Sequence, residues 1–516
     1  MTIHSETAKR DQRLKERELE IAEYRAKLDP FIGIRMRWRA SVARHLFHIL
    51  PGQTILEIGS GDGALSFELA RVTNNACPIT DAVFSAQFKD VLEDTLTNQP
   101  ITVTLLESFP GSLADKKFDY IIAHHLLGNS NNLALLDQIK GILKPGGCLL
   151  LFEPNPWNPY LILRTILGLP LRFFFKTSTN WPSLNRIELL SLFSRVGFTN
   201  VNALPYDFLY PPIPKKLFWF FQKISLVMEN APYLRNFAGS LMIYGNNIGE
   251  PEQKDWSDVL CIHKTLYHKV SFIIPCHNEE MNIPPLVASI LSHYNTYVKE
   301  IILIDDNSND NSAETIRDIL KKDRRIQLIQ RSAPQGVGRA LHEGMQQASG
   351  NYLVLMDCDF QHLIPELQDL FEAIDKGAQV AIGSRFSRES VLINYAFTKI
   401  LANRFFHYLI KFFLYKQLRD VSNNLKIMTK EVADNLVIES NGFAANMETG
   451  LKPYLLGYQV KEIPVSWINR TIHMGFSDFK MRETGPHFLK MLVTLIKRKV
   501  LKQPWQPPCQ KTQKRT

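Results

Sequence analysis

Two long stretches of the chain alternate short apolar runs with longer segments in which apolar residues recur every three or four positions. The short runs predict β-strands and the longer segments predict amphipathic helices. This alternation is typical of a mostly parallel sheet with helices on both faces. A polar stretch at 246–269 separates the two, so we predict an α/β protein of two domains. Strands are expected at 54–58, 101–106, 118–123 and 148–152, and then at 270–275, 300–305, 325–330, 352–356 and 378–383.

Changes in polarity set the expected domain boundaries. Residues 1–34 are typical of a charged, solvated N-terminal helix, and because they contain no apolar core we expect no secretory signal there. We assign the first domain to 35–250, a linker to 251–267, the second domain to 268–485 and a basic amphipathic tail to 486–516.

The composition is that of a globular protein, with 45% hydrophobic, 22% charged and 10% aromatic residues. The net charge of +9 suits anionic partners such as phosphates, nucleotides or acidic lipid headgroups, and does not single out nucleic acid. The six cysteines are scattered and form no CxxC pair, so we expect no disulfide framework and a reducing cytoplasm as the compartment.

The first predicted strand runs into a glycine-rich turn, Gly59-Ser-Gly61-Asp-Gly63, and then into a helix. Glycines here let a ligand approach the amide groups of a helix N-terminus. The turn also satisfies the GxGxxG/A pattern of dinucleotide sites, with Asp81 where a ribose-binding acid belongs. Glu57 weighs against a dinucleotide, because a carboxylate two residues before the first glycine repels a pyrophosphate but suits the cationic amino group of a methionine moiety.

This arrangement resembles the class I S-adenosylmethionine-dependent methyltransferases over roughly residues 35–250. A strand at 118–124 and a turn at 143–147 followed by another strand support the resemblance, because they come in the expected order. It implies a Rossmann-like sheet and S-adenosylmethionine as cofactor, with Asp81 at the ribose hydroxyls and Glu107 by the adenine. A nucleotide-free domain whose glycines only form a tight turn is the alternative. The implied cofactor-binding residues are Glu57, Gly59, Gly61, Gly63, Asp81 and Glu107.

The catalytic part of this first domain is less defined by the sequence. Methyl transfer is an in-line displacement, so an enzyme supplies mainly proximity and, for some acceptors, a base. His124 or His125, at the end of a predicted strand, is the candidate base, with packing at a strand end as the alternative. The loop at 153–157 follows a strand at its carboxyl end, where acceptor-binding loops lie in open α/β sheets.

In the second stretch, the strand at 352–356 ends in Asp357-Cys-Asp359-Phe-Gln361. Alternate residues of an extended chain point to one face, so these three side chains can converge. Their oxygen atoms suit Mg²⁺ or Mn²⁺ holding a diphosphate, where the metal neutralises charge that builds on a leaving group.

Further segments accompany this one in a fixed order, at 271–280, 301–310, 336–338 and 383–385. Together they resemble the family 2 glycosyltransferases of GT-A fold over roughly residues 268–485, in the variant of dolichyl-phosphate mannose or glucose synthases. The resemblance implies a nucleotide-sugar site made by Pro275, Glu279, Asp306 and Arg385, and a metal site made by Asp357, Asp359 and Gln361.

By the same resemblance, the reaction is an inverting displacement at the anomeric carbon of a nucleotide sugar. Polyprenyl phosphate would already be an anionic nucleophile and would need no general base. Arg470 and Lys480 lie in a segment similar to that subgroup's Arg…Gly-x-Ser-x-x-Lys run, whose cations contact phosphates. These two cations join Asp357 and Asp359 as the expected catalytic residues.

The departures from this subgroup fall on the acceptor side. Serine and charged residues occupy 387–390 where the subgroup shows glycines, Asn394 replaces an arginine, and 420–424 lacks the glycine after serine. Donor and metal use are therefore expected to be intact, while the identity of the acceptor stays open.

Four segments are both apolar and basic, at 161–176, 215–227, 395–416 and 488–500. No run of 18 apolar residues is free of charge, which argues against a spanning helix. The segment 395–416 suits an interfacial helix, with a helix packed on the transferase core as the alternative. We expect a cytoplasmic protein attached peripherally to the inner face of the membrane.

These observations predict a bifunctional enzyme, a methyltransferase fused to a metal-dependent glycosyltransferase that serves synthesis of a lipid-linked or surface glycan. Its partners would be a GDP- or UDP-linked sugar and a lipid-linked acceptor. One alternative makes the methyltransferase-like domain a non-catalytic module that binds S-adenosylmethionine or acts as a scaffold. Another makes both domains lipid-surface binding modules, and the intact metal cluster speaks against it.

Overall fold

The structure is a computed structural model of the whole chain, which divides into two compact units, Met1–Glu252 and Gln253–Thr516. Each unit is considered by itself. The residues that the structure describes, a few of them by their main chain alone, are 30–47, 49–50, 53–58, 65, 69, 79–84, 102–105, 113, 115–127, 131–166, 184–208, 217–249, 255–359, 364–387, 390–393, 395–414, 418–468 and 481–507.

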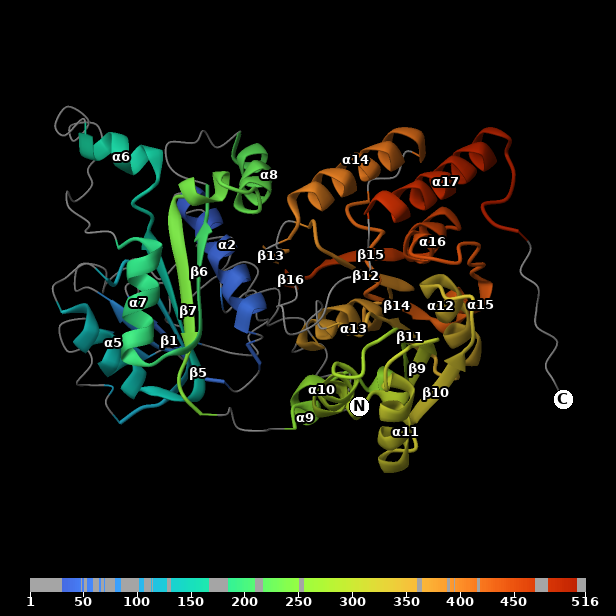
Figure 1. Cartoon of the computed structure of the whole chain (residues 1–516), viewed down its shortest axis with the longest axis horizontal. Coiled ribbons are helices and arrows are strands. Elements are labelled where there is room, and N and C mark those ends of the chain that lie inside the picture. Colours follow the sequence, from blue (N-terminus) through green and yellow to red (C-terminus); the bar gives the residue numbers. More distant parts are fainter. Residues whose placement is uncertain are drawn as a thin grey trace, which may run out of the picture. The chain divides into compact units, whose positions relative to one another are not determined.

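Unit 1 is built on one sheet with the strand order β3-β2-β1-β4-β5-β7-β6 (Figure 1). Strands β1 to β5 are parallel, and β7 runs antiparallel to both β5 and β6. The strands are β1 (Ile55–Ile58), β2 (Ile79–Phe84), β3 (Thr102–Leu105), β4 (Phe118–His124), β5 (Leu143–Pro154), β6 (Thr199–Tyr206) and β7 (Ser240–Asn246). The helices are α2 (Pro30–Phe47), α5 (Asn132–Gly141), α6 (Pro159–Ile166), α7 (Arg186–Val196), α8 (Phe218–Glu229) and the short η6 (Leu234–Phe237).

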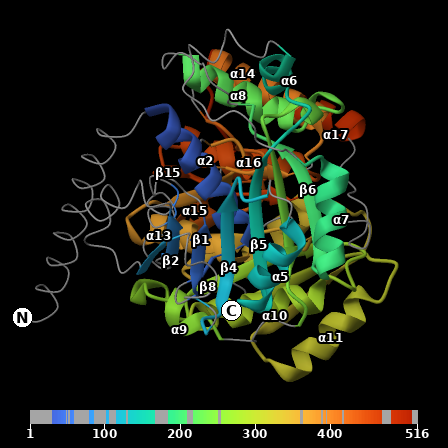
Figure 2. The ribbon, with the colours of Figure 1, turned by 90° about the vertical axis from the view of Figure 1, so that its left-hand side faces the viewer.

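Different helices pack on the two faces of this sheet. Helix α2 lies on one face, and α5 and α7 lie on the other (Figures 1 and 2). Residues of β1, β4 and β5 alternate between the faces, and one set packs with α5 and α7 in the main apolar core of the unit. The other set faces α2, where the ring of Phe47 stacks on Tyr120 and the guanidinium of Arg39 lies 4.8 Å from the ring centre of Phe152.

The α/β prediction is confirmed for unit 1, with two differences. Strands β2, β6 and β7 were not predicted; β6 reads TNVNALPY, and its polar first half is exposed, so it shows no apolar run. In addition, the turn predicted at 143–147 is an insertion within β5. The partners on β4 jump from Phe118 opposite Leu143 to Tyr120 opposite Cys148. Gly147 allows this, because a Cβ there would lie 2.9 Å from the carbonyl oxygen of Asp119.

Unit 2 has a sheet of strand order β10-β9-β8-β11-β14-β12-β15, in which β8 to β11 are parallel and β14 is antiparallel to both neighbours (Figure 1). Its strands are β8 (Val270–Cys276), β9 (Val298–Asp306), β10 (Ile326–Arg331), β11 (Tyr352–Leu355), β12 (Val380–Ser384), β14 (Lys426–Thr429) and β15 (Val460–Pro464), with a separate pair β13 (Leu392–Ile393) and β16 (Trp467–Ile468). The five strands predicted in this stretch are all present, each within two residues of its expected ends. Strands β14 and β15 were missed because they are short and carry lysine and glutamate.

Helices cover both faces of this second sheet. One face packs against α12 (Val337–Gln347) and α15 (Lys430–Asn435). On the other lie α10 (Ile283–Tyr294) and α13 (Leu367–Asp375), whose Tyr294 and Phe371 meet edge to face at 5.1 Å. The helices α14 (Phe397–Leu414), α16 (Ala444–Leu455) and α17 (Met481–Val500) share a separate apolar core, and α9 (Ser257–Leu260) and α11 (Ser312–Lys322) complete the unit. Among the helices of the described residues, none combines the length and apolarity needed to cross a bilayer.

Candidate functional site

The acidic site of unit 2 lies at one edge of its sheet. Parallel strands β8, β9 and β11 end at this edge, and the antiparallel strand β14 begins there, with Leu355 paired to Lys426. Asp357 and Asp359 follow the last residue of β11 by two and four positions, and Asp359 is 9% exposed. The structure therefore places both predicted carboxylates where the chain leaves the sheet.

Asn424 faces this pair from the segment before β14. Its Nδ2 atom donates to Oδ1 of Asp357 at 2.8 Å, and the residue is 1% exposed. Burial, and next the nearby charge of Asp359, raise the pKa of Asp357 to about 6. Within the described residues no three His, Cys, Asp or Glu side chains are grouped as a metal site. Two carboxylates still fit Mg²⁺, which is usually held by one or two carboxylates together with substrate phosphates.

Two buried cations lie behind the carboxylates. Lys426 is fully buried, its Nζ donates to the main-chain oxygens of Asn423 and, at 2.9 Å, Asn446, and burial lowers its pKa to about 7. Arg385 is paired with Asp420 through two hydrogen bonds of 2.7 and 3.0 Å. This ion pair joins Arg385 to the 420–424 segment, and the expected contact of Arg385 with the nucleotide sugar stays a prediction.

The residues expected to hold the nucleotide lie on the neighbouring strands. Pro275 is half-buried near the end of β8, and Asp306 ends β9 beside it. The carboxylate of Asp306 accepts from the amide of Gly336 at 2.6 Å and pairs with Arg331. Glu279 lies in the loop after β8, where its amide donates to a serine hydroxyl at 2.9 Å. The structure thus brings these three predicted residues to the same edge as Asp357 and Asp359.

In unit 1, Glu57 is fully buried on the sheet face that α2 covers. His124 lies on the same face, with its Nε2 atom 4.0 Å from Oε1 of Glu57 and its Nδ1 atom 2.8 Å from a guanidinium nitrogen of Arg39. A guanidinium only donates, so Nδ1 accepts and the proton of the neutral ring is on Nε2, facing Glu57. Burial, and next the charge of Arg39, hold the pKa of His124 well below its usual range. His124 therefore lies beside Glu57 in its neutral form, and its expected role as the base stays a prediction together with that of His125.

His125, the second candidate base, begins the turn after β4 with a left-handed φ of 50°. Such a conformation in a residue other than glycine is uncommon and is found often at functional sites. Glu153 holds this turn, because its Oε1 accepts from the amides of Leu126 and Leu127 at 2.8 and 3.1 Å. Burial raises the pKa of Glu153 to about 7.

The sequence analysis missed a buried polar cluster that ties α2 to the sheet. Nε of Arg35 donates to Asp207 at 2.5 Å, and guanidinium nitrogens of Arg35 and Arg39 donate to the hydroxyl of Ser240 at 3.2 and 3.1 Å. The signal in the sequence is the spacing of Arg35 and Arg39, four residues apart and so on one face of α2, a helix that also buries Ser41 and His45. This cluster fixes α2 over Glu57 and His124.

Several predicted site residues lie outside the described residues, or are described by their main chain alone. Asp81 is in β2, paired with Leu56 of β1, which puts it on the strand next to Glu57. No side-chain contact is described for it. The predicted residues outside the described part of the chain are Gly59, Gly61, Gly63, Glu107, Gln361, Arg470 and Lys480.

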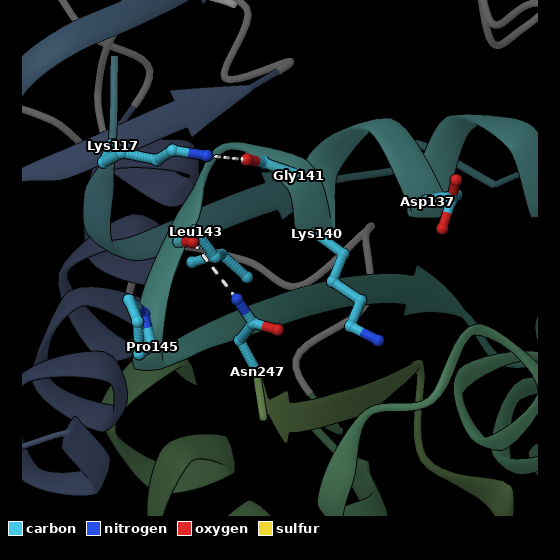
Figure 3. A pocket seen from close by; sticks show the side chains of 7 residues that line it. All are labelled: Lys117, Asp137, Lys140, Gly141, Leu143, Pro145 and Asn247. Atoms are coloured by element: carbon cyan, nitrogen blue, oxygen red, sulfur yellow. Dashed lines mark hydrogen bonds between the residues drawn. The ribbon is translucent and has the colours of Figure 1, made fainter. Parts of the chain in front are cut away.

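A depression of about 560 Å³ on unit 1 is lined by Lys117, Asp137, Lys140, Gly141, Leu143, Pro145 and Asn247. Figure 3 shows how these residues lie. It lies where β5 begins, at the sheet edge opposite the end of β1. Two of its polar side chains make hydrogen bonds within the unit. Nζ of Lys140 donates to a main-chain oxygen of α7 at 2.7 Å, and Nδ2 of Asn247 donates to the main-chain oxygen of Leu143 at 3.1 Å. The depression is therefore separate from Glu57.

Comparison with protein families gives a match in each unit. Residues 32–203 match a methyltransferase domain and residues 271–437 match glycosyl transferase family 2. Both resemblances drawn from the sequence are thereby confirmed, and so is the prediction that both domains are of transferase families.

The curated relatives are named as a mannosyltransferase and a mannose synthase. The chain is 31% identical to the dolichol-phosphate mannosyltransferase of Pyrococcus furiosus over 186 residues, 36% of this chain and 53% of that protein. It is 25% identical to the polyprenol monophosphomannose synthase of Mycolicibacterium smegmatis over 243 residues, 46% of this chain and 90% of that protein. The chain thus spans about half the length of the first of these relatives.

A solved structure, glucosyl-3-phosphoglycerate synthase from Mycobacterium tuberculosis in complex with Mn²⁺ and uridine-diphosphate-glucose, superposes with a TM-score of 0.36 and 16% identity over 49% of this chain and 86% of that one. The family matches and the two α/β units agree on the domain content of the chain. The chain carries a methyltransferase domain followed by a glycosyl transferase family 2 domain.

Proposed function

We propose that unit 2 transfers a sugar from a GDP- or UDP-linked donor to a polyprenyl phosphate or another lipid-linked acceptor, with inversion, and that unit 1 transfers a methyl group from S-adenosylmethionine. The observation that carries the proposal is the Asp357 and Asp359 pair at the edge where β8, β9 and β11 end, together with the names of the relatives that match this unit. Both reactions would serve one lipid-linked or cell-envelope glycan.

In the proposed sugar transfer, Pro275, Glu279 and Asp306 hold the nucleoside part of the donor. Asp357 and Asp359, with Gln361, hold Mg²⁺ or Mn²⁺, which when bound neutralises charge that develops on the leaving diphosphate. The shift of the Asp357 pKa supports this, because two carboxylates that oppose each other's ionisation are relieved by a divalent cation. Arg470 and Lys480 are proposed to contact phosphates on the acceptor side.

In the proposed methyl transfer, Glu57 accepts from the amino group of S-adenosylmethionine, and the glycine turn, Asp81 and Glu107 hold its nucleoside. His124, whose Nδ1 accepts from Arg39, lies with its Nε2 atom 4.0 Å from Oε1 of Glu57 at the covered sheet face. His124 and His125 are both proposed as candidate bases; burial, and next the charge of Arg39, lower the pKa of each, and His125 lies in the left-handed turn at the carboxyl end of β4. S-adenosylmethionine, when bound, supplies an electrophilic methyl group, and this chain's residues supply its position.

We further propose that α14 attaches unit 2 to the cytoplasmic face of a membrane. One side of the helix is packed, and the other carries a stripe at helical spacing: Leu401, Phe405, Tyr408 and Phe412 are 49%, 65%, 63% and 61% exposed. The stripe does not pack on the transferase core, so the alternative of an ordinary core helix loses its support. Exposed Lys411 among the apolar residues suits an anionic surface.

The experiment incubates the purified chain with membranes, labelled S-adenosylmethionine and a panel of nucleotide sugars, and identifies labelled lipids by mass. We expect one lipid to gain both a sugar and a methyl group. Asp359→Asn should remove the sugar and Glu57→Ala the methyl group, each leaving the other in place on any acceptor that does not require both. Binding of S-adenosylmethionine without methylation of any lipid would favour a non-catalytic first domain.

A further inference from the structure

One end of unit 1 exposes a concentration of large apolar side chains. They come from three short segments, the turn before α6 with α6 itself, the start of α8, and η6, and their exposed fractions run from 41% to 84%. Figure 1 shows α6 and α8 at the same end of the sheet of unit 1. We call this surface the apolar end of unit 1, and its residues are Trp157, Ile162, Leu163, Leu217, Phe220, Tyr233, Leu234 and Phe237.

Buried amides join the three segments into one surface. Nδ2 of Asn155 donates to the main-chain oxygens of Asn236 and Ala238 at 2.8 and 2.7 Å, and Nδ2 of Asn158 donates to that of Phe237 at 3.1 Å. Asn158 also accepts from two amides of α6 through its Oδ1 atom, and α8 packs on η6. Asn155, expected in an acceptor loop, is therefore used to hold the exposed segments together.

The sequence that contains these segments is rich in basic residues. Residues 157–187 and 208–237 contain eight Lys or Arg and one acidic residue, Glu229. Glu229 is buried, where its Oε1 accepts from the amide of Asp207 at 3.0 Å and the hydroxyl of Ser225 at 2.7 Å. Segments that expose apolar side chains and whose sequence is this rich in Lys and Arg suit a bilayer that contains anionic lipid.

The position of this surface bears on the methyl acceptor. The segment 155–163 follows the carboxyl end of β5, and β5 pairs with β4 up to His124 opposite Phe152. In open α/β sheets ligands bind outside the carboxyl ends of the strands. The apolar end of unit 1 therefore adjoins the edge at which His125 lies.

We propose that the apolar end of unit 1 binds an anionic bilayer surface independently of α14, and that the methyl acceptor of this unit is carried by a membrane lipid. The proposal rests on the methyl transfer proposed above for the same unit. It specifies that the acceptor reaches the sheet edge from the bilayer, so a water-soluble acceptor is not the physiological one.

The first test measures flotation of the full chain with vesicles of phosphatidylcholine and phosphatidylglycerol. Phe405→Glu with Phe412→Glu removes the α14 contribution, and the remaining binding should fall at least tenfold when Phe220→Glu and Leu234→Glu are added. Ile248→Glu is the matched control, since Ile248 is 62% exposed but lies beyond β7 at the opposite sheet edge. Equal loss in test and control variants, or no loss in either, would overturn the proposal.

The second test places an environment-sensitive fluorescent thiol label at Ile162→Cys, with Ile248→Cys as control and the similarly treated wild-type chain as background. Vesicles should raise the emission several-fold at position 162 and leave position 248 unchanged. Emission at 162 that is already high without vesicles would mean that another part of the chain or a second copy covers this surface, and would contradict the proposal.

The two proposals fail in distinguishable ways. Calorimetry of the full chain with S-adenosylmethionine reports on the proposed methyl transfer, and all variants above should bind it as the wild type does. Normal cofactor binding with unchanged vesicle binding would overturn only the membrane contact of unit 1. Absent cofactor binding would overturn the proposed function and leave the vesicle result standing. Label from S-adenosylmethionine should enter the organic phase of a lipid extract, and label confined to the aqueous phase would exclude a lipid-borne acceptor.

Discussion

The two units place acidic side chains at corresponding edges of similar sheets, but they surround them differently. In unit 1 one buried carboxylate, Glu57, faces a neutral imidazole that is itself held by Arg39. In unit 2 two carboxylates, Asp357 and Asp359, lie together, and burial, followed by the charge of Asp359, raises the pKa of Asp357. A single oriented carboxylate suits a monovalent ammonium group, whereas a pair that resists full ionisation calls for a divalent cation.

The two buried cations near Asp357 and Asp359 do not remove this difference between the two sites. Arg385 is neutralised by Asp420, and Lys426 has a pKa lowered to about 7, so neither supplies a full compensating charge to the pair. In unit 1, by contrast, Arg35 and Arg39 share Asp207 and Ser240 in a closed network. The comparison teaches that unit 1 balances its buried charges within the chain, whereas the carboxylate pair of unit 2 leaves room for the divalent cation proposed above.

The largest expected effect comes from weakening the carboxylate pair. Asp359→Asn should lower glycosyl transfer at least about a hundredfold, because a stabiliser of leaving-group charge is lost. Rates with Mg²⁺, with Mn²⁺ and in chelator are the measurement. Asp318→Asn, which changes an exposed carboxylate paired with Lys321, is the control and should transfer normally. Wild-type transfer that persists unchanged in chelator would contradict the metal assignment.

The counterpart in unit 1 is Glu57→Gln, which keeps the shape and removes the charge. S-adenosylmethionine should bind about 10- to 100-fold more weakly, as expected for a lost hydrogen bond between charged groups. Glu153→Gln is the matched control, because Glu153 is equally buried but uses its oxygen on two amides of the turn, an acceptor role that glutamine keeps. If calorimetry finds that NAD binds and S-adenosylmethionine does not, the role given to Glu57 is wrong.

The sequence predicted the parts of these sites that are local in the chain. Glu57 lies within the apolar strand β1, and Asp357 with Asp359 closely follows the apolar strand β11, so each belongs to one short segment whose spacing alone carries the information. The same holds for the strands of both sheets that consist of uninterrupted apolar residues.

The contacts that the sequence could not predict join residues that are far apart in the chain. Asn424 meets Asp357 across 67 residues, and only the insertion of antiparallel β14 beside β11 puts them opposite each other. Arg35 meets Asp207 across 172 residues. Strands such as β15, which reads VKEIP, are defined by their neighbours and not by an apolar run.

Asn424 gives a third, smaller prediction. Asn424→Ala removes the donor that orients Asp357, and outer partners of metal ligands commonly contribute about tenfold or more to affinity. Mn²⁺ binding, measured by electron paramagnetic resonance on the chain without substrate, should weaken about tenfold. Asn435→Ala, at an exposed asparagine that bonds to a tyrosine hydroxyl, should bind Mn²⁺ like the wild type. Equal affinities for both variants would show that Asp357 needs no such support.

The smallest expected effect is the change of stability with pH, which should have opposite signs in the two units. In unit 1 burial raises the pKa of Glu153 to about 7 and that of Glu229 to about 8, from an ordinary value near 4.5. Between pH 7 and 8 the folded unit therefore binds more protons than the unfolded chain, and its stability falls as pH rises. In unit 2 the lowered pKa of Lys426 means that the folded unit binds fewer protons than the unfolded chain, so its stability rises over the same window.

Hydrogen exchange of the full chain, corrected for the intrinsic pH dependence of amide exchange, measures both units at once. From pH 7 to 8 the slowest amides of β5 should lose protection and those of β8 should gain it. Glu229→Gln keeps both accepted hydrogen bonds and should reduce the change in β5 alone, because the proton that the folded unit retains is gone. Lys426→Met should abolish the change in β8 alone. Parallel changes in β5 and β8 would show that these buried groups do not control the two stabilities, since their linkage requires opposite signs.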